Sequence, residues 1–186
     1  FANELNERVQ ERTAELQQER DRLVSLYQIT SELGRTLDMS SVLNGALDMV
    51  SDAVKAEEAV VLLIDPSSSE PYARAIRHPS GQIEIAGEAS ASQNGETYAD
   101  RKHHPAVMVG RWLMDQSERA VLIPDLKSEP YWNAKAAGAR KWKSALSVAL
   151  ESEGQPVGAL VFFSSKKEAF TDPQLRLVAA AAGQVS

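Results

Sequence analysis

A basic stretch between residues 131 and 150 stands out in a chain whose formal net charge is −6. It contains Lys135, Arg140, Lys141 and Lys143 and no acidic residue. Ammonium and guanidinium groups gathered in this way attract carboxylates and phosphates. The stretch therefore predicts a docking place for an anionic ligand or partner. The alternative is a solvated surface that balances the acidic remainder, and Arg140 is the residue with which to test it.

Four aromatic residues fall within 31 residues and include all three tryptophans of the chain: Trp112, Tyr131, Trp132 and Trp142. Aromatic walls suit stacking on a flat ring or the binding of a cation. Ordinary core packing is the alternative, because tryptophan is also the largest core residue.

Adjacent histidines at positions 103 and 104 precede Pro105 and could bind a metal ion or haem iron. The chain has no cysteine and no spaced carboxylate cluster, so an exposed pair in a loop is the simpler interpretation. We find no nucleophile triad, glycine-rich phosphate loop or carboxylate pair at a recognisable spacing. We therefore expect no catalytic activity in this fragment.

Composition narrows the class of protein further. At 186 residues the chain suits one domain plus an additional helix. Its negative charge disfavours nucleic acid and anionic membranes as partners, and no apolar run reaches the 18 or so residues that span a bilayer. We expect a cytoplasmic fragment of a longer protein, which could itself be membrane-anchored.

The chain beyond residue 37 alternates between helical and strand patterns. Asp38, Ser40 and Ser41 supply cap chemistry for a helix over 42–54. Further helices are predicted at 105–116, at 131–142 with an interruption at Gly138, and from 171 to the end of the chain.

Strands are predicted where apolar and β-branched residues gather between turn signals. The expected strands are 59–64, 72–77, 82–85, 121–124, 146–150 and 156–163, with a close backbone approach at Gly158. Residues 86–104 are left as a loop. The economical architecture is one α+β domain with a mostly antiparallel sheet covered by helices on both faces.

The first 37 residues carry apolar side chains at alternating four- and three-residue intervals, which is typical of a coiled coil. The predicted dimer seam comprises Leu5, Val9, Leu16, Leu23, Leu26, Leu33 and Leu37. In a parallel dimer this register places Glu15 opposite Arg20 of the partner. We expect a signalling helix over 1–37 and a domain over 38–186. The alternative is a long amphipathic helix lying on its own domain.

Polar residues interrupt the predicted seam at Arg12, Glu19 and Thr30. They could weaken the coil enough for two registers to coexist, or they could reflect a seam that drifts from perfect heptads.

Three stretches resemble the GAF domain, a sensory module of histidine kinases and related signalling proteins. They are VLIPD followed by SEPY within residues 121–131, GQPVGAL at 154–160 and AFTD at 169–172. Residues 6–16 (NERVQERTAEL) also resemble the linker helix that often follows a HAMP module in sensor kinases. The resemblance implies a GAF-like α+β fold, dimerisation through the entering and leaving helices, and a small-molecule pocket. Carried over by position, Trp112, Asp125, Tyr131, Trp132, Arg140 and Trp142 would border that pocket.

The absence of cysteine limits what this resemblance implies. Covalent bilin attachment and the GAF-like reduction of free methionine sulfoxide both need cysteine, so both are excluded. The asparagine-lysine-phenylalanine-aspartate-glutamate signature of cyclic-nucleotide-binding relatives is also missing. We therefore expect a dimeric sensory or relay domain, most simply of a histidine kinase, with an unidentified small ligand. The alternatives are a ligand-free dimerisation spacer and a non-covalent haem sensor using His103 or His104.

Overall fold

The computed structural model describes residues 2–86 and 101–185, without the side chains of 27–43 and 184–185. It divides into two compact units, Phe1–Val42 and Leu43–Ser186. The predicted 86–104 loop falls mostly outside the described residues.

Helix α1 (Ala2–Val54) is continuous through both units. The prediction that a new helix begins near Asp38 and Ser40 is therefore wrong. Cap residues signal a helix start only where the backbone leaves helical geometry, and no proline occurs before Pro66 to force such a break.

The predicted seam residues of the first unit are exposed in the single chain. Leu5, Val9, Leu16, Leu23 and Leu26 have exposed fractions between 52% and 67%. The side chains of Leu33 and Leu37 lie outside the described residues. Glu15 forms an ion pair with Arg12 of its own chain at 3.2 Å, whereas its expected partner across a dimer is Arg20. The coiled coil stays a prediction.

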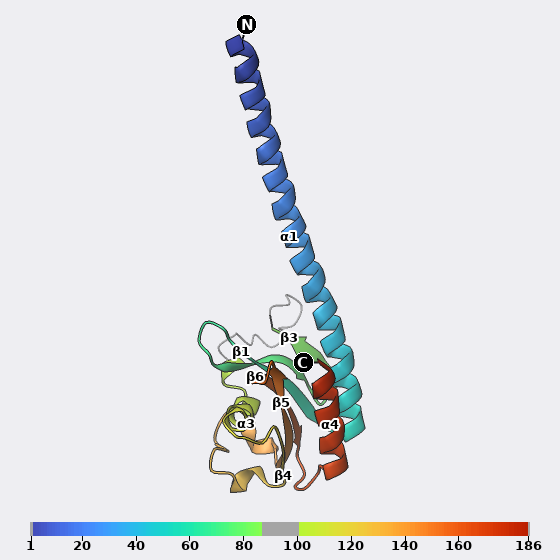
Figure 1. Ribbon diagram of the computed structural model, residues 1–186. Helices are drawn as coiled ribbons and strands as arrows, with labels where there is room; N and C mark the ends of the chain where they lie inside the picture. The colour runs from blue at the N-terminus through green and yellow to red at the C-terminus, as the bar shows by residue number, and fades with distance from the viewer. Residues whose placement is uncertain (1, 87–100, 186) are drawn as a thin grey trace. The chain divides into compact units, whose positions relative to one another are not determined.

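The second unit is built on one six-stranded sheet, which is antiparallel throughout (Figure 1). Its strands are β1 (Glu58–Ile64), β2 (Pro71–Arg77), β3 (Ile83–Ile85), β4 (Ala120–Ile123), β5 (Ser144–Ser152) and β6 (Gln155–Ser164). Their order is β3-β2-β1-β6-β5-β4. The predicted α+β class with an antiparallel sheet is confirmed.

The β5–β6 hairpin closes through the two-residue turn of Glu153 and Gly154, which have φ angles of 52° and 78°. Two positive φ values match the twist of the flanking strands, and glycine adopts such a value without strain. The hairpin predicted over 146–163 is therefore confirmed.

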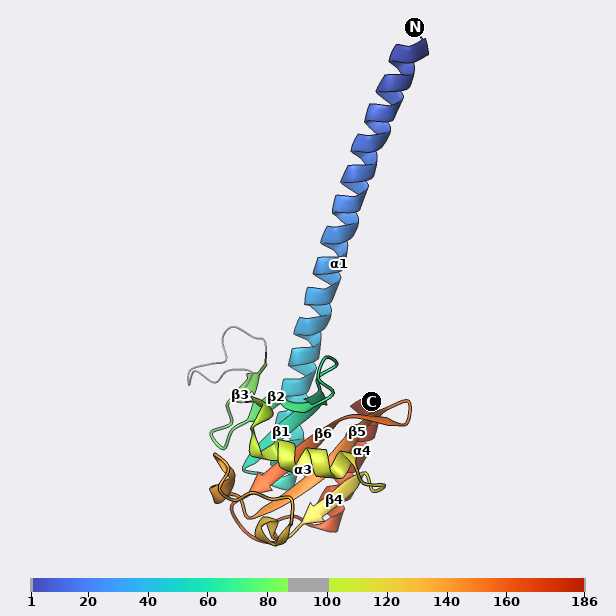
Figure 2. The same ribbon diagram turned by 90° about the vertical axis from the view of Figure 1, so that its left-hand side faces the viewer.

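Helices cover both faces of this sheet, as predicted. Helix α3 (Pro105–Met114) lies on one face and α4 (Asp172–Val185) on the other, with the last turns of α1 beside α4 (Figures 1 and 2). Successive residues of a strand point to opposite faces. In β1, Val60 and Leu62 therefore join the core under α3, whereas Ala59 and Val61 join the core under α1 and α4.

Gly158 allows the two central strands to approach closely. A Cβ atom at this position would overlap the carbonyl oxygen of Leu62 on β1. The close backbone approach predicted at this glycine is confirmed, and it lies in the middle of the sheet.

The predicted helix over 131–142 is wrong. This segment forms successive three-residue turns, in which the amides of Ala136, Ala139 and Trp142 each bond the carbonyl three residues earlier. Only Ala139–Lys141 forms a 3₁₀ turn, η2, and it follows Gly138 at a φ of 75°. A left-handed residue ends any α-helix at that point, so the segment is irregular apart from η2. Another short 3₁₀ turn, η1 (Leu126–Ser128), follows β4.

None of the helices within the described ranges has an apolar stretch suited to crossing a lipid bilayer.

Candidate functional site

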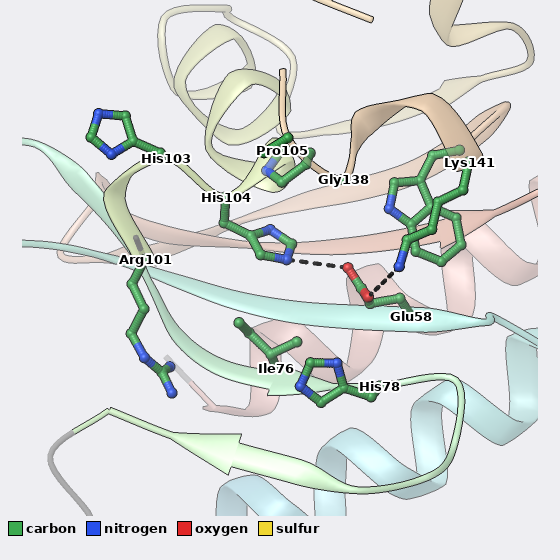
Figure 3. Close-up of a pocket in the computed structure, with 11 residues that line it drawn as sticks. Glu58, Ile76, His78, Arg101, His103, His104, Pro105, Gly138 and Lys141 are labelled. Atoms are coloured by element: carbon green, nitrogen blue, oxygen red, sulfur yellow. Dashed lines mark ion pairs between the residues drawn. The ribbon is translucent and has the colours of Figure 1, made fainter. Parts of the chain in front are cut away.

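A cavity of about 420 Å³ opens on the α3 side of the sheet (Figure 3). Strands β1 and β2 supply its floor, the residues before α3 one wall, and the turns around Gly138 another. Its charged and ionisable lining residues are Glu58, His78, Arg101, His103, His104 and Lys141. Pro105, Gly138 and Trp142 also line it. The cavity thus combines polar groups with an aromatic wall, as small-molecule sites do.

Glu58 places a carboxylate at the floor of this cavity and is only 2% exposed. It shares its face of β1 with Val60 and Leu62, because strand residues alternate. Its Oε1 lies 3.2 Å from His104 Nε2 and its Oε2 lies 3.7 Å from Lys141 Nζ (Figure 3). Among the described residues, Oε1 has no partner in hydrogen-bond geometry. A buried carboxylate of this kind is ready to accept a bond from a ligand.

His104 positions α3 as well as facing Glu58. Its Nδ1 accepts the backbone N–H of Ala106 at 3.1 Å and so caps the helix. A nitrogen that accepts a bond carries no proton, so the ring proton of the neutral imidazole is on Nε2, toward Glu58. The prediction that both histidines are exposed in a loop is correct for His103 and wrong for His104, whose side chain is only 15% exposed.

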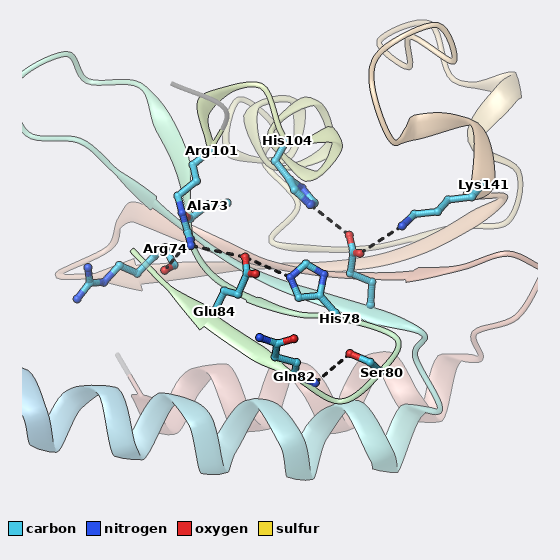
Figure 4. Close-up of polar contacts among 10 residues, drawn as sticks. Ala73, Arg74, His78, Ser80, Gln82, Glu84, Arg101, His104 and Lys141 are labelled. Carbon is cyan, nitrogen blue, oxygen red and sulfur yellow. Dashed lines mark hydrogen bonds and ion pairs between the residues drawn. The ribbon is translucent and has the colours of Figure 1, made fainter. Parts of the chain in front are cut away.

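A second charged group borders the cavity at the β2–β3 hairpin. Buried Glu84 lies 3.3 Å from His78 Nε2 and 3.9 Å from an Arg101 guanidinium nitrogen (Figure 4). Arg101 also donates a 3.0 Å hydrogen bond to the carbonyl oxygen of Ala73 on β2. These contacts fix the guanidinium in place, so it forms a rigid part of the cavity wall.

The cavity therefore offers a small polar molecule a buried acceptor at its floor and cationic groups at its sides. Within residues 2–86 and 101–185, no cluster of three potential ligand side chains could hold a metal ion.

The six predicted ligand residues separate into three places. Trp132, Arg140 and Trp142 line a second cavity of about 290 Å³, and Trp142 also lines the larger one. Trp112 and Tyr131 stack on each other with ring centroids 4.8 Å apart, and they line neither cavity.

Asp125 maintains the local fold. Its carboxylate accepts hydrogen bonds from Lys167 Nζ at 2.6 Å and from the amide of Lys127 at 3.2 Å. The hydrogen bond from Lys167 is the main reason that the pKa of Asp125 lies below its ordinary value. These contacts join η1 to the loop that follows β6.

Two of the tryptophans are core residues as well as cavity walls. Trp142 stacks on Phe163 with centroids 5.4 Å apart, and Trp132 meets the same ring at 5.9 Å. Burial also raises the pKa of neighbouring Tyr131. Trp132 and Trp142 therefore fit both interpretations of the aromatic residues, core packing and the lining of a ligand cavity.

Sequence reasoning missed Glu58, His78 and Arg101. One usable signal existed: Glu58 directly precedes the apolar run 59–64, and two-residue alternation places it on the face of Val60 and Leu62. An acid at such a position is costly unless it has a purpose or a partner.

The comparison with family models identifies this arrangement. The model of the GAF domain matches residues 36–186. The chain therefore belongs to the GAF domain family. A comparison with curated proteins gives no match.

Solved structures share the fold at low sequence identity. A domain assigned to a two-component sensor histidine kinase of Sinorhizobium meliloti is 13% identical, with 78% of this chain and 86% of that chain covered and a TM-score of 0.51. The GAF domain of Acinetobacter phosphoenolpyruvate-protein phosphotransferase is 15% identical, with 75% of each chain covered and a TM-score of 0.51. The type II free methionine-R-sulfoxide reductase of Thermoplasma acidophilum is 14% identical, with coverages of 76% and 85% and a TM-score of 0.51.

Proposed function

We propose that this GAF domain is the sensory or relay module of a larger cytoplasmic or membrane-anchored signalling protein, most simply a histidine kinase. A small polar molecule binds in the larger cavity and changes the packing of the helices that enter and leave the domain. The family supports a sensory role, and one structural neighbour is assigned to a sensor histidine kinase.

The observation that carries this proposal is the alternation of side chains along β1 and β2. Glu58 and Ile76 line the cavity, whereas Ala59 and Ala75 belong to the core that contains α4. A ligand that shifts β1 therefore also shifts the adjacent residues of that strand, which belong to the core with α4. A tenfold affinity preference for one helix arrangement shifts the free-energy difference between the two arrangements by about 1.4 kcal/mol in its favour.

The proposed output is a change in how the two parallel N-terminal helices of a homodimer pack against each other. The C-terminal helix forms a second contact of this dimer. The exposed apolar seam at Leu5, Val9, Leu16, Leu23 and Leu26 supports this part, because a row of exposed apolar side chains gains stability by burial against a partner.

Native mass spectrometry of freshly purified protein tests both parts, since it reports the stoichiometry and any retained small molecule together. Sedimentation then compares the wild type with a Leu16→Glu, Leu23→Glu double variant and with Gln17→Glu as the matched control outside the seam. We expect dimers for the wild type and the control, and monomers for the double variant. A wild type that stays monomeric at high concentration contradicts the dimer.

The ligand part is tested by thermal shift with a metabolite panel on wild type and Glu58→Gln. We expect a ligand that stabilises the wild type by several degrees and the variant by less. The absence of any shift favours a ligand-free spacer. A Soret band in the purified protein would favour the haem alternative, although Nδ1 of His104 already accepts the Ala106 amide.

A further inference from the structure

The smaller cavity is lined by three cationic side chains and by no acidic one. Its lining residues are Lys127, Trp132, Ala134, Lys135, Ala139, Arg140 and Trp142. The cations come from two segments, η1 and the turns of 131–142, which the fold brings together. At about 290 Å³, the cavity has room for a small organic or inorganic ion and some water.

Within the described residues, two nearby basic side chains, Lys141 and Lys167, have a counter-charge that these three cations lack. Lys141 lies 3.7 Å from Glu58, and Lys167 lies 2.6 Å from Asp125. Among the ion pairs of the described residues, none involves Lys127, Lys135 or Arg140. Three like charges around one cavity produce a local positive potential in an acidic protein.

The two tryptophans that line the cavity have indole N–H groups without a hydrogen-bond acceptor in the described part of the chain. Trp132 and Trp142 are 8% and 2% exposed, and neither buried indole Nε1 has a hydrogen-bond partner among the described residues. An indole N–H can only donate. Leaving such a donor buried without an acceptor is unfavourable. Walls with spare donors and unpaired cations are suited to an oxyanion.

We propose that this cavity is a binding site for a small oxyanion, a phosphate or carboxylate group, separate from the larger cavity. Arg140 supplies the forked guanidinium that matches two oxygen atoms, and Lys127 and Lys135 supply point charges. The indole N–H groups of Trp132 and Trp142, unpartnered within the described residues, are the neutral donors in this proposal.

The test is a titration of the whole chain with sodium phosphate, and separately with sodium acetate, at constant ionic strength. Calorimetry and tryptophan fluorescence are the readouts, since two of the three tryptophans line the cavity. We expect saturable binding of at least one anion, and the comparison distinguishes phosphate from carboxylate. No saturable binding of either anion up to about 10 mM, a range that covers weak millimolar affinities, overturns the proposal.

Variants then locate the site. Arg140→Gln and Lys135→Gln remove a lining charge, and Lys143→Gln is the matched control because it removes a charge from the same stretch outside the cavity lining. We expect Arg140→Gln to weaken binding by about tenfold or more, and Lys143→Gln to change it less than twofold. Equal losses of affinity in Arg140→Gln and in the control Lys143→Gln mean that diffuse charge alone attracts the anion, which overturns the site.

Trp132→Phe tests the indole donors, because it keeps an aromatic ring and removes the N–H. We expect weaker anion binding, by about threefold to tenfold.

Thermal unfolding of each variant establishes that it is folded. If Arg140→Gln is unstable, the second variant is Arg140→Lys, which keeps the charge but loses the forked guanidinium. We expect Arg140→Lys to bind with an affinity between those of wild type and Arg140→Gln. Wild-type affinity in both Trp132→Phe and Arg140→Lys overturns the proposed contacts.

Discussion

His104 connects the start of α3 to the buried carboxylate of Glu58: its Nδ1 accepts the Ala106 amide, and its Nε2 lies 3.2 Å from Glu58 Oε1. One imidazole therefore caps a helix and borders the larger cavity. Any ligand that takes over Glu58 as an acceptor also changes the environment of the residue that holds α3.

Replacing His104 separates these two roles. We expect His104→Ala to lower the free energy of unfolding by about 1–3 kcal/mol, because it removes the cap and leaves Glu58 with fewer partners. His104→Asn should lose less, since asparagine is a favoured N-cap residue. Urea unfolding measures both variants. Equal losses would show that the cap contributes little.

Gly158 should tolerate no larger residue. We expect Gly158→Ala to lower the free energy of unfolding by about 3 kcal/mol, because its Cβ would overlap the Leu62 carbonyl oxygen in the middle of the sheet. Gly45→Ala is the control: it lies within α1, and its Cβ would have no neighbour within 4 Å. That variant should gain about 0.5–1 kcal/mol from better helix propensity. Thermal unfolding distinguishes the two, and a neutral Gly158→Ala contradicts the tight strand pairing.

The ion pair of Asp125 with Lys167 should contribute stability that disappears in acid. The pKa of Asp125 is lower in the folded chain than its ordinary value, so the contribution is present above that ordinary value, near pH 4, and is lost as the pH falls through the folded pKa. We expect Asp125→Asn to unfold at a lower temperature than wild type at pH 7, with a smaller difference at pH 3. Glu153→Gln at the exposed β5–β6 turn is the control and should change the unfolding temperature little at pH 7.

Polar residues in the predicted seam should weaken the dimer. We expect Arg12→Leu with Glu19→Leu to tighten dimerisation by at least tenfold in sedimentation, because two more heptad positions become apolar. Glu11→Leu lies outside the seam and should change dimerisation little. In the intact protein, unchanged signal output in the double variant would contradict a coil that switches between registers.

Local patterns were sufficient for most of the fold. The apolar run 59–64 became β1, and the alternation at Leu146, Val148 and Leu150 became β5 of the predicted hairpin. These predictions succeeded because a buried face imposes its own period on a continuous stretch of residues. The same reasoning failed for 131–142, where Gly138 and three-residue turns replaced a helix, because side-chain packing on Phe163 overrides weak helical propensity there.

The sequence by itself determined the strands, the last two helices, the absence of cysteine chemistry and the apolar seam of the first 37 residues. Only the tertiary structure decided that Glu58, Arg101 and Lys141 surround one cavity and that Lys127 joins Lys135 and Arg140 at another. The reason is physical: periodicity reports which side of its own element a side chain occupies. Which remote segments then face each other depends on sheet order and on turns whose geometry is settled by packing.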